Sequence, residues 1–196
     1  MGRKSVQEEK RVRIMEALNQ CLQEKSFDQT SIKDIARAAQ VNHGLLHYYF
    51  KSKEDILINY IDFVIDHYKS MFAVLLAEKE NKGLDEKQLL EWFFQAMGER
   101  ITLNRRLSKV FIEIWEIAAY NPVVREKVRR AYREWMATVA GYLQRVVPDP
   151  AAARRIGTAV VAFLEGMSLF SILLDAQELE LSEVLTGFQR RILQML

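Results

Sequence analysis

Helical periodicity runs through almost the whole chain and leaves little room for any other kind of structure. Only 3 of the 196 residues are proline and 8 are glycine, so few positions force the backbone out of a helix. Apolar residues recur three and four positions apart, the spacing that collects them on one face of a helix. The chain is therefore predicted to be all-α, without strands.

Helix-breaking and capping residues divide the chain into predicted helices. Pro148-Asp149-Pro150 ends one helix and starts the next, with Asp149 as the N-cap and Pro150 at the first position. Asn81 and Gly83 end a long helix in the same way. The predicted helices span residues 6–25, 53–79, 85–103, 105–120 and 123–147, with two short helices after Ser31 and Asn42, one starting after Asp149 and a last one from Ser182.

Residues 30–55 have the pattern of two short helices joined by a tight turn. Ser31 and Asp34 have the spacing of a capping box, in which each side chain accepts a hydrogen bond from the other residue's backbone amide. Asn42 is a favourable N-cap for the second short helix. That layout predicts a helix-turn-helix motif, whose second helix reads DNA in the major groove.

A third capped helix follows the motif directly. Ser52 and Asp55 repeat the capping-box spacing, between Lys51 and Lys53. A helix start with unpaired backbone amides and positive charge suits a phosphate group, so this terminus is predicted to contact the DNA backbone.

Charge is concentrated at the amino-terminal end. Residues 1–53 contain ten basic and six acidic residues, a net charge of +4, which leaves −2 on the rest of a chain whose total is +2. Neutralising phosphates is the sequence-independent part of DNA affinity. A basic head on a nearly neutral body therefore fits a DNA reader better than an RNA-coating protein.

The segment resembles the DNA-binding domain of the tetracycline-repressor (TetR) family from Lys10 to about Ile65. The family's usual turn glycine is Gln40 here, its common serine cap is Asn42, and its common tyrosine after Leu46 is His47. The matching residues are Phe27-x-x-Thr30-Ser31-Ile32-x-Asp34-Ile35-Ala36, then Val41, Gly44, Leu46, Tyr49 and Phe50, and the exit Lys51-Ser52-Lys53-Glu54.

The resemblance lets roles be expected for individual residues of the motif. We expect Val41, Leu46 and Phe50 to be core, and Arg3 and Lys4 to form an arm toward DNA. The expected base-edge contacts are Asn42, His43, Leu45 and His47; the expected phosphate contacts are Ser31, Tyr48 and Lys53, with Lys33 suited to either and Tyr49 as a further DNA-binding residue.

Two histidines also raise the question of a metal site. His43 and His47 stand four residues apart, the spacing of a zinc-protease helix, but Gly44 replaces the glutamate that such a site uses as a general base. No third ligand is evident. We therefore predict DNA contacts for both histidines, and no metal or cofactor.

Residues 156–174 form the most apolar stretch, with Glu165 as its one charged residue. Its length would suit a membrane span, but a central carboxylate is costly there, so we expect a fully buried helix. Thr158, Ala162 and Gly166 form a ridge of small residues on which another helix could pack closely. With an apolar stripe on the last helix that includes Phe188 and Ile192, this ridge predicts a four-helix homodimer interface, which the TetR resemblance also implies.

Aromatic side chains on successive helices of the carboxyl-terminal half have two interpretations. They can be packed core, or they can line an effector pocket with a few polar anchors, where Trp rings and a buried acid could hold a cation. The Trp115, Asn121-Pro122 and Trp135 run resembles the choline-responsive BetI-like branch of the family but specifies no ligand. The candidate pocket residues are Tyr68, Trp92, Phe93, Phe111, Trp115, Trp135, Phe163 and Glu165.

Together these features predict a dimeric transcription regulator. Residues 1–52 would form the DNA-binding domain and residues 53–196 the effector-binding and dimerisation domain. The TetR resemblance, with the unbroken long helix, implies that a small-molecule effector would tilt that helix and release a double-stranded palindromic operator, with repression as the family's commoner outcome. A dimeric scaffold without DNA binding is the alternative; an enzyme is less expected, because no G-x-S-x-G, Walker or dinucleotide-binding motif is present.

Cysteine content and the amino terminus indicate where such a protein would work. Cys21 is the one cysteine, so no internal disulfide can form, and it lies on the apolar stripe of the first predicted helix. Residues 1–13 are charged and lack the apolar centre of a signal peptide. We expect a cytoplasmic protein that does not cross a membrane.

Overall fold

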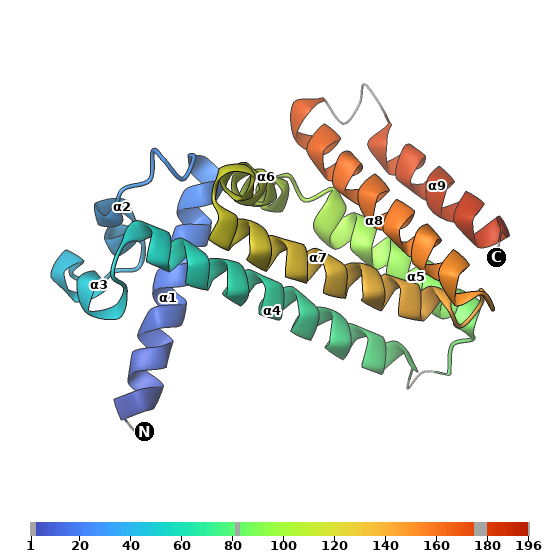
Figure 1. Ribbon diagram of the computed structural model, residues 1–196, viewed down its shortest axis with the longest axis horizontal. Coiled ribbons are helices and arrows are strands. Elements are labelled where there is room, and N and C mark those ends of the chain that lie inside the picture. The colour runs from blue at the N-terminus through green and yellow to red at the C-terminus, as the bar shows by residue number, and fades with distance from the viewer. Residues whose placement is uncertain (1–2, 81–82, 175–179, 196) are drawn as a thin grey trace. The chain divides into compact units, whose positions relative to one another are not determined.

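The computed structural model describes residues 3–80, 83–174 and 180–195, and no strand occurs among them (Figure 1). The predicted all-α fold is confirmed. The helices are α1 (Arg3–Glu24), α2 (Ile32–Ala38), α3 (His43–Tyr49), α4 (Lys53–Glu80), α5 (Glu86–Met97), α6 (Arg105–Tyr120), α7 (Pro122–Leu143), α8 (Pro150–Leu173) and α9 (Leu181–Met195), with a π-helical segment, η1 (Gly98–Thr102), between α5 and α6.

Most predicted boundaries agree with these helices to within a few residues. Asp149 caps α8 as predicted, because its carboxylate accepts the amide of Ala151 at 2.9 Å. The predicted helix over 85–103 was wrong in one respect: regular α-helix ends at Met97, and the next five residues form η1. The helix predicted to reach 147 ends at Leu143.

The chain packs as two compact units. Unit 1 comprises residues 1–70 and 109–128, and unit 2 comprises residues 71–108 and 129–196. This division by packing does not follow the predicted boundary after residue 52, because the first part of α4 and the 109–128 segment share a core with the helix-turn-helix. Helices α4, α6 and α7 each contribute residues to both units.

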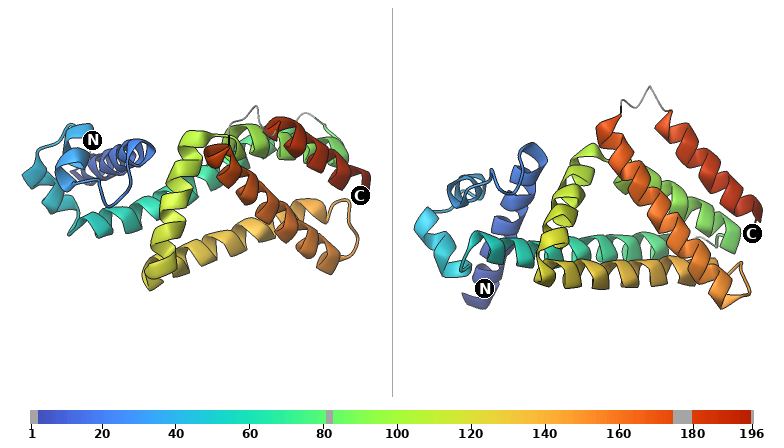
Figure 2. Two further views of the ribbon diagram at one scale, coloured as in Figure 1. Left: turned by 90° about the horizontal axis from the view of Figure 1, so that it is seen from above. Right: turned by 45° about the horizontal axis from the view of Figure 1, so that its top comes forward.

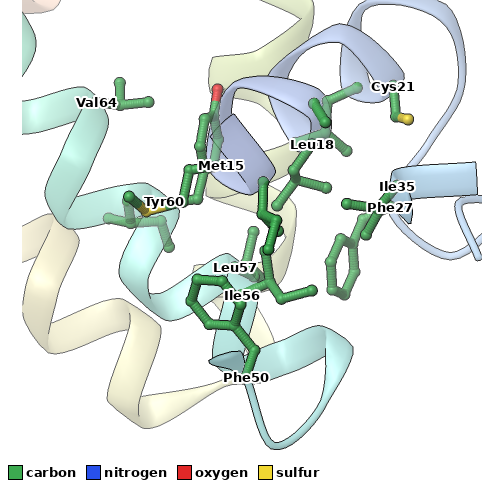
Figure 3. Packing of buried hydrophobic residues seen from close by; sticks show 14 of the residues in the cluster. Met15, Leu18, Cys21, Phe27, Ile35, Phe50, Ile56, Leu57, Tyr60 and Val64 are labelled. Carbon is green, nitrogen blue, oxygen red and sulfur yellow. The ribbon is translucent and has the colours of Figure 1, made fainter. Parts of the chain in front are cut away.

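The core of unit 1 gathers side chains from α1, α2, α3, α4 and α6. The α1 stripe that includes Ile14, Leu18 and Cys21 is buried, so Cys21 is a packing residue as predicted. Leu18 belongs to the same buried cluster as Leu57 and Tyr60 of α4 (Figure 3). The Tyr60 hydroxyl, at the buried end of its ring, donates a hydrogen bond to Asn19 Oδ1 at 2.6 Å. Each large apolar side chain buried here contributes about 1.5–3 kcal/mol.

The core of unit 2 is built mainly from α5, α8 and α9. Leu90 and Phe93 of α5, Leu164 of α8 and Leu185 of α9 are all buried. Helices α8 and α9 run side by side in opposite directions (Figures 1 and 2). Gly157 lets α8 approach α7 closely, because a Cβ there would lie 3.2 Å from the Ala140 backbone nitrogen.

Helix α8 is not fully buried, contrary to the expectation. Among the described residues, α8 is long and apolar enough to cross a membrane by length and composition alone. In its most apolar stretch, 39% is buried inside the protein. One face, with Val160, Leu164 and Met167, packs in the unit 2 core, while Phe170 and Leu173 on the other face are 45% and 65% exposed. Core helices of soluble proteins pass the same test of length and composition.

The π-helical segment brings α9 close to the end of α5. A Cβ at Gly98 would overlap Cδ2 of Leu185 on α9. Next to this contact, the Gln189 amide donates a hydrogen bond to the Phe94 carbonyl at 2.7 Å. The absence of a side chain at position 98 therefore sets how closely α9 packs.

Replacing Gly98 by alanine is expected to destabilise the protein by about 1–3 kcal/mol, because the buried Leu185 side chain must move to admit the methyl group. Gly141→Ala on α7 is the matched control, since a Cβ there meets nothing within 4 Å. It should stabilise the helix by about 0.5–1 kcal/mol. Urea unfolding followed by circular dichroism measures both, and equal stability of the two variants would contradict this account.

Candidate nucleic-acid interface

The start of α2 is fixed by the predicted capping box. Ser31 Oγ accepts the Asp34 amide at 3.1 Å, and Asp34 Oδ2 accepts the Ser31 amide at 2.9 Å. The ammonium group of Lys25, just after α1, lies 2.7 Å from the same carboxylate. The hydrogen bond from Lys25 is the main reason that the pKa of the Asp34 carboxyl lies well below its usual range, and the hydrogen bonds from Ser31 lower it further. The carboxylate therefore stays charged and joins the end of α1 to the start of α2.

The turn between α2 and α3 forms without a glycine. Gln40 adopts the left-handed conformation, with φ of 53°, and its carbonyl-bearing side chain accepts a hydrogen bond from Arg13 at 3.2 Å. The next residue, Val41, returns its amide to the Ala36 carbonyl at 3.0 Å. Gln40 thus fills the place of the glycine that the TetR pattern usually has.

Helix α3 has one anchored face and one exposed face. The Asn42 side chain caps it by accepting the Gly44 amide at 2.8 Å, and Leu46 is fully buried. Tyr48 is 68% exposed. Because the buried residue fixes the rotation of the helix, the side chains on its other face point into solvent in a defined order.

Most of the predicted DNA-binding residues lie on exposed positions of α2 and α3. The imidazole rings of His43 and His47 meet edge to face, with centroids 5.2 Å apart. Tyr49 is half-buried and packs edge to face on Tyr48, with ring centroids 5.1 Å apart. The exposed members of the predicted set are Ser31, Lys33, Asn42, His43, Leu45, His47 and Tyr48.

Lys53 has a structural partner that the sequence did not suggest. Its ammonium donates a hydrogen bond to the Phe27 carbonyl at 2.9 Å and lies 4.2 Å from the centre of the Phe27 ring. Lys53 is half-buried. Its predicted phosphate contact would have to be made in addition to these bonds.

The start of α4 also differs from the predicted capping box. Asp55 donates its amide to Ser52 Oγ at 3.1 Å, but its carboxylate accepts the Lys51 amide at 2.9 Å. The Lys51 amide is therefore not free for a phosphate, contrary to the expectation. Glu54 adds a second carboxylate, whose pKa is lowered by its own backbone amide and by Ser52.

Several cations of the basic head hold unit 1 together. Arg11 donates to the Tyr49 carbonyl and to Asn59 Oδ1, both at 2.8 Å, and lies 4.4 Å from the Phe50 ring centre. By contrast, Lys33 and Lys51 are exposed, and their side chains form no ion pair within the described ranges. Helix α1 begins at Arg3, so Arg3 and Lys4 lie on its first turn and not in a separate arm.

The candidate effector residues are divided between the two units. Phe111 and Trp115 belong to unit 1, where their rings stack with centroids 6.5 Å apart. Phe93 belongs to unit 2 and is fully buried, 5.4 Å from the Tyr142 ring and 6.0 Å from the Trp135 ring. Phe93 is therefore core. The other unit 2 members are Trp92, Trp135, Phe163 and Glu165, and the side chain of Tyr68 lies outside the described residues.

Glu165 is the polar member of the unit 2 set. It is half-buried on α8, and burial raises its pKa to about 7, while a hydrogen bond from Tyr132 opposes the rise. A carboxyl group in this state changes its charge near neutral pH. It can accept a cation as a partner, since a neighbouring positive charge favours the ionised form.

The predicted dimer residues separate into two groups. Thr158 and Ala162 are exposed, and a Cβ added at Gly166 would meet nothing within 4 Å. Phe188 stacks on Phe163 with ring centroids 3.7 Å apart, so its ring takes part in α8–α9 packing within the chain. Ile192 is half-buried and packs on the same core.

Sequence reasoning missed the role of Glu113. It stands on α6 among apolar residues, and its Oε2 accepts the Phe27 amide, 86 positions away, at 2.8 Å. An acid on an otherwise apolar helix face was the available signal, but the partner is a backbone group and no side-chain pattern marks it.

The described residues contain no group of three or more His, Cys, Asp or Glu side chains that could hold a metal ion.

Comparisons with known proteins agree with this geometry. Residues 14–60 match "Bacterial regulatory proteins, tetR family", and residues 87–194 match "BetI-type transcriptional repressor, C-terminal". A helix-turn-helix regulator from the dhlA 5' region of Xanthobacter autotrophicus, itself uncharacterised, is 24% identical, covering 92% of this chain and 89% of that protein. The regulator BetI of Serratia proteamaculans is 23% identical, covering 90% of this chain and 87% of its own.

Solved structures show the same fold. A transcriptional regulator from Saccharomonospora viridis, crystallised in complex with choline, superposes with a TM-score of 0.76 at 22% identity, covering 92% of this chain and 95% of that one. The second family match spans residues 87–194, more than half of the chain. The protein therefore belongs to the tetR family and is a helix-turn-helix transcriptional regulator, not an enzyme.

Proposed function

We propose that the protein is a ligand-released repressor that binds a palindromic operator as a homodimer. The observation that carries the proposal is α3, a short helix held by Leu46 on one side while polar and aromatic side chains face solvent on the other. In a helix-turn-helix the second helix enters the major groove. Such a regulator would act in the cytoplasm, where the DNA is.

Base reading and backbone contact fall to different side chains in this proposal. His43 and His47 stand on the exposed face of α3 and would reach base edges together with Asn42 and Leu45. Lys33, exposed on the first turn of α2, would contact a phosphate. Ser31 and Tyr48 would also contact phosphates, and Tyr49 would be a further DNA-binding residue beside Tyr48. For Lys53 the structural bonds to Phe27 make a mutational test ambiguous, so Lys33 is the better probe.

Binding to the DNA upstream of its own gene tests this function, with two variants as mutual controls. His43→Ala should lower affinity for that DNA about tenfold and leave affinity for random DNA unchanged, because a lost base contact costs about 1–3 kcal/mol. Lys33→Gln should weaken both and reduce the slope of log K against log salt by about 0.9. Fluorescence anisotropy over a salt series measures both effects.

The same assay separates the proposal from its rival, a dimeric scaffold without DNA binding. A wild-type protein that shows no preference for the upstream DNA over random sequence would favour the scaffold. Equal losses on both DNAs for His43→Ala would remove that residue from base reading.

The homodimer is proposed from the exposed face of α8. Leu169, Phe170 and Leu173 are 36%, 45% and 65% exposed in the single chain. Adjacent apolar groups on one surface mark an interaction site. The small ridge of Thr158, Ala162 and Gly166 continues this face and would let the α8 of a second copy pack closely.

Gly166→Glu should dissociate the dimer, because a charge would be buried in the proposed interface. The single chain should tolerate the change, since nothing lies within 4 Å of a Cβ at this position. Gly141→Glu on α7, equally open, is the control and should stay dimeric. Light scattering after size-exclusion chromatography measures the mass; a dimeric Gly166→Glu variant, or a monomeric wild type, would refute the interface.

For the effector we propose a small organic cation of the choline type. The match to BetI-type repressors and the choline held by the Saccharomonospora viridis regulator support this class. Within unit 2, Glu165 supplies a half-buried carboxylate hydrogen-bonded to Tyr132. A quaternary ammonium group pairs well with such an acid and with aromatic faces.

Choline should raise the melting temperature and weaken operator binding, while 3,3-dimethyl-1-butanol, its uncharged isostere, should do neither. A ligand at 100 times its Kd stabilises the folded state by about 2.7 kcal/mol. Glu165→Gln should remove the response to choline and leave DNA binding intact. Equal effects of choline and its isostere, or an unchanged response in Glu165→Gln, would exclude the cation site.

A further inference from the structure

In the loop between α1 and α2, both backbone polar groups of Phe27 are hydrogen-bonded to side chains of other helices. Its amide donates to Glu113 Oε2 at 2.8 Å, and its carbonyl accepts from the Lys53 ammonium at 2.9 Å. The same ammonium covers the Phe27 ring, which is 6% exposed. Side chains from α4 and α6 thus clamp one residue of the loop that leads into α2.

This loop determines where α2 begins. The Thr30 amide bonds the carbonyls of Ser26 and Phe27, at 3.1 and 3.0 Å, and the buried Thr30 hydroxyl donates to Ser26 at 2.9 Å. The next residue is Ser31, the N-cap of α2. A displacement of the Phe27 peptide would therefore move the cap of α2 and the Lys33 side chain on its first turn.

Glu113 links the position of α6 to the α1–α2 loop, because its side chain is carried by α6 and bonds the Phe27 amide. Its neighbours Val110 and Ile114 are buried in the unit 1 core, and the carboxylate is half-buried. A charged acceptor makes a hydrogen bond about twice as strong as a neutral one. Leaving the Phe27 amide without a partner in this place would carry the cost of an unsatisfied polar group.

We infer that Glu113 is a positioning residue for operator binding, which holds the α1–α2 loop through the Phe27 amide and makes the DNA-binding face depend on α6. The inference rests on the proposed operator binding and adds a regulatory contact to it. Contact with DNA is not its role. Its negative charge would, if anything, repel phosphates.

Two neutral variants of similar size isolate the hydrogen bond. Glu113→Gln loses the charge but keeps an oxygen that can accept the Phe27 amide, whereas Glu113→Met loses both charge and acceptor. If Glu113 acted on DNA only through its charge, both variants would bind DNA more tightly. If it positions the loop, Glu113→Met alone should bind the operator more weakly.

The experiment uses the full-length protein, the DNA upstream of its own gene and random DNA of equal length. We expect Glu113→Gln to bind the upstream DNA within about twofold of wild type, and Glu113→Met about tenfold more weakly, a change of about 1.4 kcal/mol. Binding to random DNA should weaken in Glu113→Met as well, because displacing the cap of α2 also moves Lys33, a proposed phosphate contact. Hydrogen exchange of the Phe27 amide should accelerate in Glu113→Met and stay slow in Glu113→Gln.

Glu116→Gln is the control, because Glu116 is exposed on the same helix and loses the same charge; its affinity and Phe27 exchange should match wild type. Circular dichroism establishes folding at the assay temperature, and Glu113→Ala replaces the Met variant if that variant unfolds. Unchanged operator affinity without the acceptor, or equal weakening by Gln and Met, would overturn the inference. Absence of operator binding by wild type would instead overturn the proposed function.

Discussion

The burial of Leu46 and Phe50 against the α1 core is the interaction on which the DNA-binding face depends. Helices α2 and α3 contain seven residues each, and helices of this length are not stable alone in water. Their shape therefore comes from caps at their starts and from packing at Ile35, Leu46 and Phe50, which are 0%, 0% and 1% exposed. Because those contacts use one face of each helix, the opposite face stays exposed to solvent, and the proposed DNA contacts there would not conflict with folding.

Polar bonds around this core have a second function, which is to place the small helices relative to α1, α4 and α6. Asp34 ties α2 to Lys25, Arg11 ties the end of α3 to α1 and α4, and Lys53 with Glu113 ties the α1–α2 loop to α4 and α6. Some basic side chains of residues 1–53 therefore stabilise the fold, whereas others, such as Lys33 and Lys51, are exposed to solvent. A net charge of the segment overstates the charge that is available to phosphates.

Local signals explain what the sequence could predict. Caps at Ser31, Asn42 and Asp149 depend on neighbours two or three residues away, and all three form as expected. Contacts between distant segments follow no local pattern: the partner of Lys53 is a carbonyl 26 positions away, and the ring of Phe188 stacks on Phe163 of the same chain. For the same reason the half-exposed state of α8 could not be predicted from its sequence, because residues 156–174 contain a single charged residue and do not indicate which face is covered.

Helix α6 contributes residues to both units, so it can relate a contact in one unit to a contact in the other. Near its start, the Ser108 hydroxyl bonds Ser168 of α8 at 2.7 Å in unit 2, and further along it Glu113 bonds Phe27 in unit 1. Side chains on one unbroken helix cannot shift independently, because its backbone hydrogen bonds fix their spacing. A ligand that favours one setting of α6 against α8 would therefore bias the Phe27 contact as well. Such coupling is reciprocal by thermodynamic necessity, so if a ligand weakens operator binding, as proposed, bound operator would weaken ligand binding by the same factor.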